Sequence, residues 1–185
     1  MARKKILLVG GSGFIGSWLT HSLLPDNDVF IFDLAEPFFT RGSSSSVATA
    51  KILDFRSRLR TGSVNYMGDV RDFKSVEAVF SAVRPDIVIC LSSIPVEGFS
   101  DRRKQIETEI NGVTNMLAAN EVIGARFIFI SSFLALGDFA SIATEEYRLS
   151  PRTIFGAGKA VAGRFVISHA LSSYAVVRLA GVYGF

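Results

Sequence analysis

Six short, largely apolar runs recur along the chain, and most are followed by a polar or glycine-rich turn. The runs lie at 6–9, 29–32, 64–67, 86–91, 127–132 and 174–178. Most of them lack strict alternation of apolar and polar residues, which is typical of strands buried on both faces of a parallel sheet. Longer segments with helix signals separate the runs. The pattern therefore predicts an α/β fold.

The later segments between strands predict helices with defined ends. Asp72 stands where an N-cap is expected, and its helix stops before Pro85. Longer helices are predicted over 101–120 and 153–172. The first of these has apolar residues at spacings of three and four: Ile106, Ile110, Val113 and Leu117.

The region from Leu34 to Gly62 is polar and irregular, and at most a short helix is expected at 48–58. So long a connection in a compact domain is either a functional loop or plain surface. Right-handed crossovers make 3-2-1-4-5-6 the leading strand order, that of a Rossmann-type doubly wound sheet. At 185 residues the chain suits a single domain, residues 1–185.

The first strand runs directly into a turn with glycine at 10, 13 and 16. Gly10, Gly13 and Gly16 permit a tight turn, close approach of the backbone to a pyrophosphate, and close packing of the next helix. Free N–H groups where that helix starts, at Phe14 and Ile15, would face the phosphates. Glycine-rich turns also join strands to helices without any ligand, so the spacing alone leaves both interpretations open.

Asp33 ends the second strand, 17 residues after Gly16, close to the usual position of an acidic ribose ligand. A carboxylate there accepts hydrogen bonds from the adenosine ribose hydroxyls and repels a 2′-phosphate. The sequence therefore predicts NAD rather than NADP as cofactor. The alternative is that Asp33 is an ordinary turn residue after a strand.

Composition excludes several other classes of protein. No apolar run reaches the ~18 residues of a membrane helix, and the apolar segment at 6–9 is too short for a signal peptide, so a cytoplasmic protein is expected. Cys90 is the single cysteine, which excludes an internal disulfide and a zinc site built on cysteines; we expect it in the core, and no metal site is predicted. The net charge of +3 gives nucleic-acid binding little support, and Arg56, Arg58 and Arg60 are interpreted as a solvated face.

Several motifs in order resemble those of the extended short-chain dehydrogenase/reductases, the NAD-dependent sugar-nucleotide epimerases and dehydratases. The motifs are Gly10–Gly16, Asp33, Gly68-Asp69, Leu91-Ser92-Ser93, Ser131-Ser132, Phe155 with Lys159, and 178–184. The resemblance implies that Asp69 and Val70 contact the adenine and that Leu91, Ser92 and Ser93 follow the cofactor. It also implies a nucleotide-sugar substrate and a homodimer built from the helices at 101–120 and 153–172.

In that family a serine or threonine, a tyrosine and a lysine carry the chemistry, and these positions are Ser132, Phe155 and Lys159 here. The tyrosine shuttles a proton, which phenylalanine cannot do. Lys159 is expected to bind the nicotinamide ribose, and the alternative is a solvated helix lysine. Ser132 is expected to polarise a substrate carbonyl, and the alternative is a strand-end hydroxyl bonded to backbone.

Two further positions depart from the family pattern, because Glu109 and Gly181 stand where asparagine is usual.

The chain also stops where family members continue into a C-terminal substrate lobe, so it is expected to be either a fragment or a compact protein that kept the nucleotide fold. The leading hypothesis is a slow or inactive epimerase or dehydratase. The alternative is a non-catalytic dinucleotide-binding module that senses redox state or supports a partner enzyme.

Overall fold

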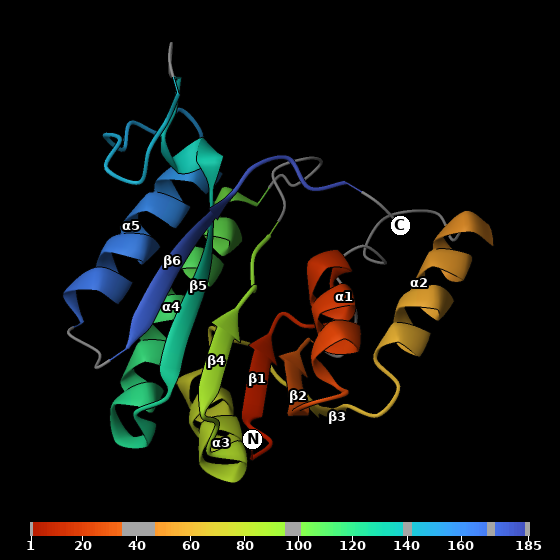
Figure 1. Cartoon of the computed structure of the whole chain (residues 1–185). Coiled ribbons are helices and arrows are strands. Elements are labelled where there is room, and N and C mark those ends of the chain that lie inside the picture. The colour runs from red at the N-terminus through yellow and green to blue at the C-terminus, as the bar shows by residue number, and fades with distance from the viewer. Residues whose placement is uncertain (1, 35–46, 95–100, 139–141, 170–172, 184–185) are drawn as a thin grey trace.

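The computed structural model of the chain describes residues 2–34, 47–94, 101–138, 142–169 and 173–183. Within them, six parallel strands form one sheet in the order β3-β2-β1-β4-β5-β6, as predicted (Figure 1). The strands are β1 (Lys5–Val9), β2 (Asp28–Asp33), β3 (Val64–Met67), β4 (Ile87–Cys90), β5 (Arg126–Ser132) and β6 (Tyr174–Leu179). This is the strand order of a Rossmann-type doubly wound sheet.

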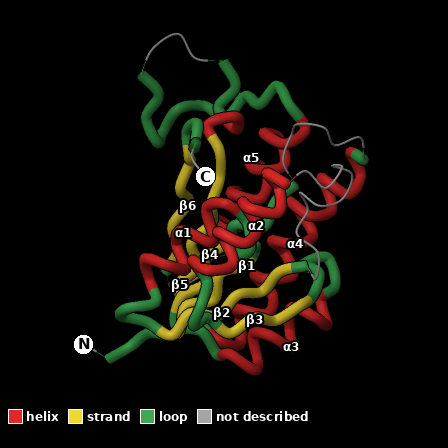
Figure 2. The backbone as a smooth tube through the Cα atoms, turned by 90° about the vertical axis from the view of Figure 1, so that its right-hand side faces the viewer, coloured by secondary structure: helices red, strands yellow, loops and turns green. Residues whose placement is uncertain are grey.

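Helices cover both faces of the sheet. They are α1 (Phe14–Leu23), α2 (Val47–Leu59), α3 (Phe73–Val83), α4 (Arg102–Ile123), the short 3₁₀ helix η2 (Phe133–Ala135) and α5 (Ile154–Ser168). Seen from the β3 edge, α1 lies on one side of the strands and α3 and α4 lie on the other (Figure 2). The two faces carry separate apolar clusters, one against α1 and the other against α3, α4 and α5.

Alternate residues of the central strands supply these two clusters. On β1, Leu7 and Val9 join the cluster under α3, α4 and α5, whereas Ile6 and Leu8 join the one under α1. All four are buried. A strand buried on both faces needs apolar residues at every position, which is why the sequence shows continuous apolar runs.

Helix boundaries follow the local capping chemistry. The Asp72 side chain accepts a hydrogen bond from the N–H of Lys74 and so caps α3, as predicted. The helix expected at 48–58 is α2, and residues 35–46 of the same connection lie outside the described part of the chain. The helix expected at 153–172 is shorter within the described residues, because α5 ends at Ser168.

The helix predicted at 101–120 is α4, and it is longer than predicted. It continues to Ile123 because Gly124 adopts a left-handed conformation (φ 73°) that caps it there. In its first half the apolar positions do not mark the buried face: Ile106 is 43% exposed, whereas Gln105 and Glu109 are buried. These polar side chains find partners inside, since Gln105 donates to the carbonyl of Ile94 and Glu109 accepts from Ser93.

Within the described ranges, no helix combines the length and the apolar character needed to cross a membrane.

Candidate dinucleotide site

The turn after β1 requires glycine at two positions for steric reasons. Gly10 has φ +81°, and a Cβ there would lie 2.6 Å from the backbone nitrogen of Ser92. At Gly16 a Cβ would lie 2.5 Å from the Cα of Gly11. These glycines therefore let the turn close against the chain beyond β4 and bring α1 close to the turn.

Gly13 is different, because the protein itself leaves room for a side chain. Its backbone (φ −72°, ψ −177°) suits any residue, and an added Cβ would meet Gly10 O alone, at 3.6 Å. Gly13 is also the N-cap of α1 and provides no side-chain cap. The first N–H groups of α1, on Phe14 and Ile15, have no acceptor within the helix, and free N–H groups of this kind can bind an anion. This cradle fits a pyrophosphate.

The carboxylate of Asp33 is held at the edge of this turn. Its Oδ2 accepts a hydrogen bond from the backbone N–H of Ser12 and its Oδ1 accepts one from that of Leu34, each 2.8 Å long. Asp33 is therefore a structural residue of the turn, as the alternative interpretation had it. Each oxygen keeps a lone pair, so the same carboxylate can also accept from ribose hydroxyls.

A cavity of about 300 Å³ lies beside Asp33, and Arg60 is among its lining residues. The prediction that Arg56, Arg58 and Arg60 form a solvated face is wrong for two of the three. Arg56 lies over the ring of Phe14, 5.3 Å from its centroid. Burial lowers the pKa of Arg60, and the charge of Asp33 opposes that effect. Only Arg58 is exposed as expected, paired with Asp54.

The segment expected to contact adenine follows β3. A Cβ at Gly68 would lie 2.5 Å from the Phe32 ring, so glycine is needed where this segment crosses β2. Asp69 accepts two hydrogen bonds of 3.0 Å from Nε of Arg71, one at each carboxylate oxygen, and another at 2.5 Å from Nη2. Val70 is buried, and its carbonyl accepts from the side chain of Asn115. The structure thus fixes both residues beside the edge of the sheet.

The other half of the candidate site lies beyond β4, against α4 and α5. Leu91, Ser92 and Ser93 follow β4 directly, and the Ser93 hydroxyl donates to Oε1 of Glu109. The other oxygen of Glu109 lies 3.0 Å from Nζ of Lys159. These contacts join the segment after β4 to α4 and α5.

Lys159 is not a solvated lysine, so that alternative is wrong. It is 3% exposed, and its Nζ lies 5.0 Å from the centroid of the Phe129 ring and 5.7 Å from that of Phe155. Glu109, 1% exposed, supplies the opposite charge. A Cβ at Gly158 would lie 3.0 Å from the Cβ of Glu109, so glycine lets α5 approach α4 here. The acidic partner of Lys159 was missed, although the departure from asparagine at 109 marked the position.

Ser132 ends β5 and caps the short helix η2, because its Oγ accepts from the N–H of Leu134 at 3.2 Å. This bond agrees with the interpretation of Ser132 as a strand-end hydroxyl bonded to the backbone. Its hydrogen is not used in that bond, so the hydroxyl keeps the capacity to donate.

Cys90 is fully buried at the end of β4, as predicted. Its sulfur lies 3.6 Å from Oγ of Ser92. Burial raises the pKa of this thiol to about 11.

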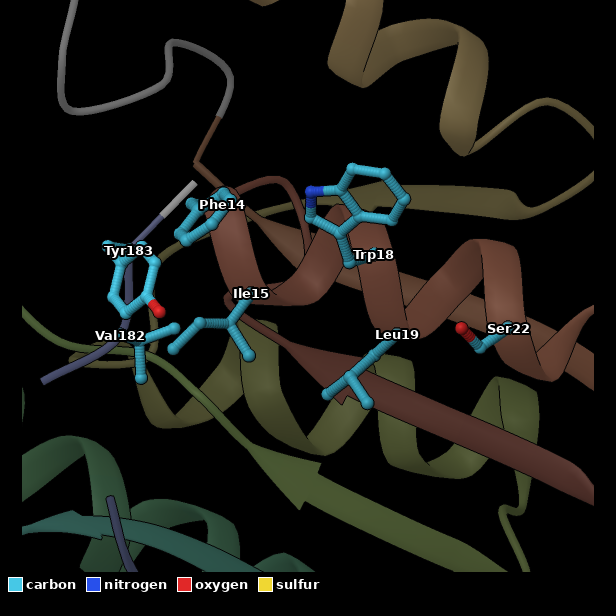
Figure 3. A pocket seen from close by; sticks show the side chains of 7 residues that line it. All are labelled: Phe14, Ile15, Trp18, Leu19, Ser22, Val182 and Tyr183. Atoms are coloured by element: carbon cyan, nitrogen blue, oxygen red, sulfur yellow. The ribbon is translucent and has the colours of Figure 1, made fainter. Parts of the chain in front are cut away.

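An apolar groove of about 500 Å³ runs along α1 and begins at the side chains of Phe14 and Ile15. Figure 3 shows Phe14, Ile15, Trp18 and Leu19 on one side of it, with Val182 and Tyr183 opposite the start of the helix. Its lining carries little polarity, so it does not suit a phosphate.

The strand order, the glycine turn and the acidic residue after β2 together define a dinucleotide-binding α/β protein. Residues 6–185 match the NAD dependent epimerase/dehydratase family, and the chain belongs to that family. NAD is the cofactor of this family, in agreement with the prediction from the turn and from Asp33.

Curated relatives and solved structures are consistent with this assignment. The chain is 27% identical to UDP-glucose 4-epimerase 4 of Oryza sativa subsp. japonica over 183 residues, which cover 95% of the chain and 48% of that protein. It is 27% identical to UDP-glucuronic acid decarboxylase 1 of Xenopus tropicalis, over 98% of the chain and 41% of that protein. The chain thus spans about half the length of these relatives.

Among solved structures, a UDP-glucose 4-epimerase of Thermotoga maritima with UDP-glucose superimposes with a TM-score of 0.78 and 25% identity. The alignment covers 97% of the chain and 56% of that structure. The Bordetella bronchiseptica enzyme WbmG in complex with NAD has a TM-score of 0.78 at 22% identity, covering 98% of the chain and 55% of that structure. At 22% identity, the similarity to WbmG shows a common fold and nothing further.

Proposed function

We propose that residues 1–185 form the NAD-binding domain of a nucleotide-sugar epimerase or dehydratase whose acid/base chemistry is impaired. One observation carries the proposal: the start of α1 lies next to the carboxylate of Asp33. The helix has no side-chain cap at Gly13, where the protein leaves space, and Asp33 accepts a hydrogen bond from the N–H of Ser12 in the same turn. This pairing of an anion cradle with a ribose acceptor suits a dinucleotide.

Each candidate residue has a role along the bound dinucleotide. The N–H groups of Phe14 and Ile15 bind the pyrophosphate, and Asp33 binds the adenosine ribose. Asp69 and Val70 contact the adenine at the far edge, while Leu91, Ser92 and Ser93 line the middle of the cofactor. Lys159 approaches the nicotinamide ribose.

Bound NAD supplies a hydride acceptor. The chain must then supply a proton acceptor for the sugar hydroxyl, and the family residue for this task is replaced by Phe155. Ser132 keeps a donor for a substrate oxygen, but an oriented hydroxyl alone does not take up a proton at neutral pH. Loss of a positioned acid/base costs about 10²–10⁴ in rate, so slow or undetectable turnover is expected.

The substrate class is inferred from relatives whose names specify UDP-glucose and UDP-glucuronic acid. The test incubates the full reading frame that contains these residues with NAD⁺ and each UDP-sugar, and chromatography detects the product. The Thermotoga maritima epimerase serves as a positive control. We expect at least about 100-fold slower product formation than in that control. Turnover at the control's rate contradicts the impairment, and failure to bind NAD⁺ contradicts the whole proposal.

A non-catalytic dinucleotide-binding module is the second candidate, and the missing phenol together with the Glu109–Lys159 ion pair favours it. It predicts NAD⁺ binding without turnover of any UDP-sugar. A measurable turnover that disappears when Gly13 is replaced would reject this second candidate.

We also propose a homodimer formed by α4 and α5, which pack against each other. Both helices leave apolar side chains exposed: Ile106 is 43%, Val161 42% and Phe165 39% exposed. A second copy would cover them as two helices from each subunit pack together. Light scattering at micromolar concentration tests this, and a monomeric mass contradicts it. The cytoplasmic location stays a prediction.

A further inference from the structure

The buried ion pair between α4 and α5 bears directly on the lost chemistry at position 155. Lys159 follows Phe155 by one helical turn, so the two side chains share a face of α5. The Nζ of Lys159 is 5.7 Å from the ring centroid of Phe155 and 3.0 Å from Oε2 of Glu109. The ammonium is therefore closer to a carboxylate than to the ring that occupies the tyrosine position.

We propose that Glu109 is a positioning residue that holds Lys159 and cancels its charge, so that the acid/base site is disabled by two substitutions and not by Phe155 alone. The inference rests on the proposed function, since it treats position 155 as the former proton carrier. It concerns only residues of this chain and applies before any cofactor binds.

The physical argument concerns the electrostatic potential at the ring of residue 155. The Nζ of Lys159 lies 5.7 Å from the centroid of the Phe155 ring. At an effective dielectric constant of about 20, an unpaired ammonium about 6 Å from a phenolate oxygen lowers the pKa of the phenol by about 2 pH units. A carboxylate 3.0 Å from that ammonium opposes this effect, because its charge raises the pKa of the phenol. Desolvation of the half-buried position acts in the same direction, so we expect a pKa at or above the ordinary ~10.

Among the described residues, Cys90 on β4 is a titratable group whose thiol senses both charges of the pair. Burial raises the pKa of this thiol to about 11, so it is neutral at pH 7. On β5 the neighbour of Lys159 is the uncharged ring of Phe129. Ser93, beyond β4, donates to the remaining oxygen of Glu109 and keeps the carboxylate turned into the site.

The test uses tyrosine as a probe of the potential. Phe155→Tyr conserves the ring shape, and Phe155 is only half-buried, so packing should tolerate the hydroxyl. NMR of protein labelled with ¹³Cζ-tyrosine, without cofactor, follows its titration, and the unsubstituted protein identifies the signals of the four native tyrosines. We expect the phenol in the single variant to titrate at or above ~10, and the phenol in Phe155→Tyr/Glu109→Gln to titrate about 2 pH units lower.

Two controls keep the test decisive. Adding Lys159→Met to the double variant should abolish the lowered pKa, and Glu109→Asn replaces Glu109→Gln if the latter does not fold. The Phe155→Tyr variant alone can overturn the proposal. A phenol pKa clearly below ~9 in that variant means that Glu109 does not cancel the charge of Lys159. A folded double variant whose phenol titrates like that of the single variant overturns it as well. Neither outcome depends on turnover or NAD⁺ binding, so failure of the proposed function is recognised separately.

Discussion

Replacing Gly13 by alanine should separate cofactor binding from folding. An added Cβ at this position meets no protein atom closer than Gly10 O, at 3.6 Å, and the backbone angles there are ordinary for alanine. The folded protein therefore has room for the methyl group. Stability should fall by about 1 kcal/mol or less, since alanine is a poorer N-cap than glycine.

The effect on NAD⁺ should be much larger. The methyl group would stand between the turn and the phosphates, in front of the N–H groups of Phe14 and Ile15. A hydrogen bond to a charged group contributes about 1.5–3 kcal/mol. Weakening one such bond raises the dissociation constant about 10- to 150-fold.

Calorimetric titration with NAD⁺ measures this change, and thermal unfolding checks that the variant is folded. Gly163→Ala is the matched control, because a Cβ there makes ordinary contacts of 3.6 Å or more in α5 and lies outside the glycine turn. Gly16→Ala, whose Cβ would lie 2.5 Å from the Cα of Gly11, should instead lower stability. A folded Gly13→Ala protein that binds NAD⁺ as tightly as the parent refutes the placement of the pyrophosphate.

Three further predictions follow from other parts of the structure. Asp33→Asn removes the negative charge beside Arg60, so the ratio of NADP⁺ to NAD⁺ affinity measured by competition titration should rise; an unchanged ratio refutes the role of Asp33 in cofactor choice. Because the folded pKa of Cys90, about 11, is above its ordinary value of 9.0, the contribution of this thiol to stability should be constant below pH 9 and fall by about 3 kcal/mol between pH 9 and 11. Denaturant unfolding across this range should show that slope in the parent and lose it in Cys90→Ala. Thr153→Ala removes the side chain that accepts from the N–H of Gly156 at the start of α5, and should cost about 1 kcal/mol in unfolding free energy; a change below about 0.3 kcal/mol contradicts this cap.

Local features of the sequence were sufficient to predict the sheet. Each buried strand is a short apolar run, and crossover handedness left 3-2-1-4-5-6 as the leading order. Gly10 and Gly16 could be identified from the spacing of the turn, because the left-handed backbone at Gly10 and the contact of Gly16 with Gly11 are local to it. The approach of Ser92 to Gly10 comes from beyond β4 and could not be read from the turn. Asp72 was recognised as a cap for the same reason, since a capping residue acts within its own helix.

The side chains on α4 and just after α2 could not be placed in this way, because their orientation depends on distant segments. The spacing of Ile106 and Ile110 fits a helix but does not say which face is buried, and the approach of α5 at Gly158 decides that Glu109 faces inward. Arg60 turns toward Asp33 through the path of the chain after α2. Whether a charged side chain is buried thus depends on its pairing with a side chain from another segment, and no local sequence pattern specifies that pairing.

The most direct test of the central claim, that this chain keeps a complete cradle for NAD, is a crystal structure of the protein grown with NAD⁺. The account predicts pyrophosphate oxygens about 3 Å from the backbone nitrogens of Phe14 and Ile15 and the adenosine ribose hydroxyls on Asp33. It further predicts the nicotinamide ribose beside Lys159, with that lysine still paired to Glu109. A dinucleotide bound elsewhere on the molecule, or none bound at a saturating concentration, would contradict the account.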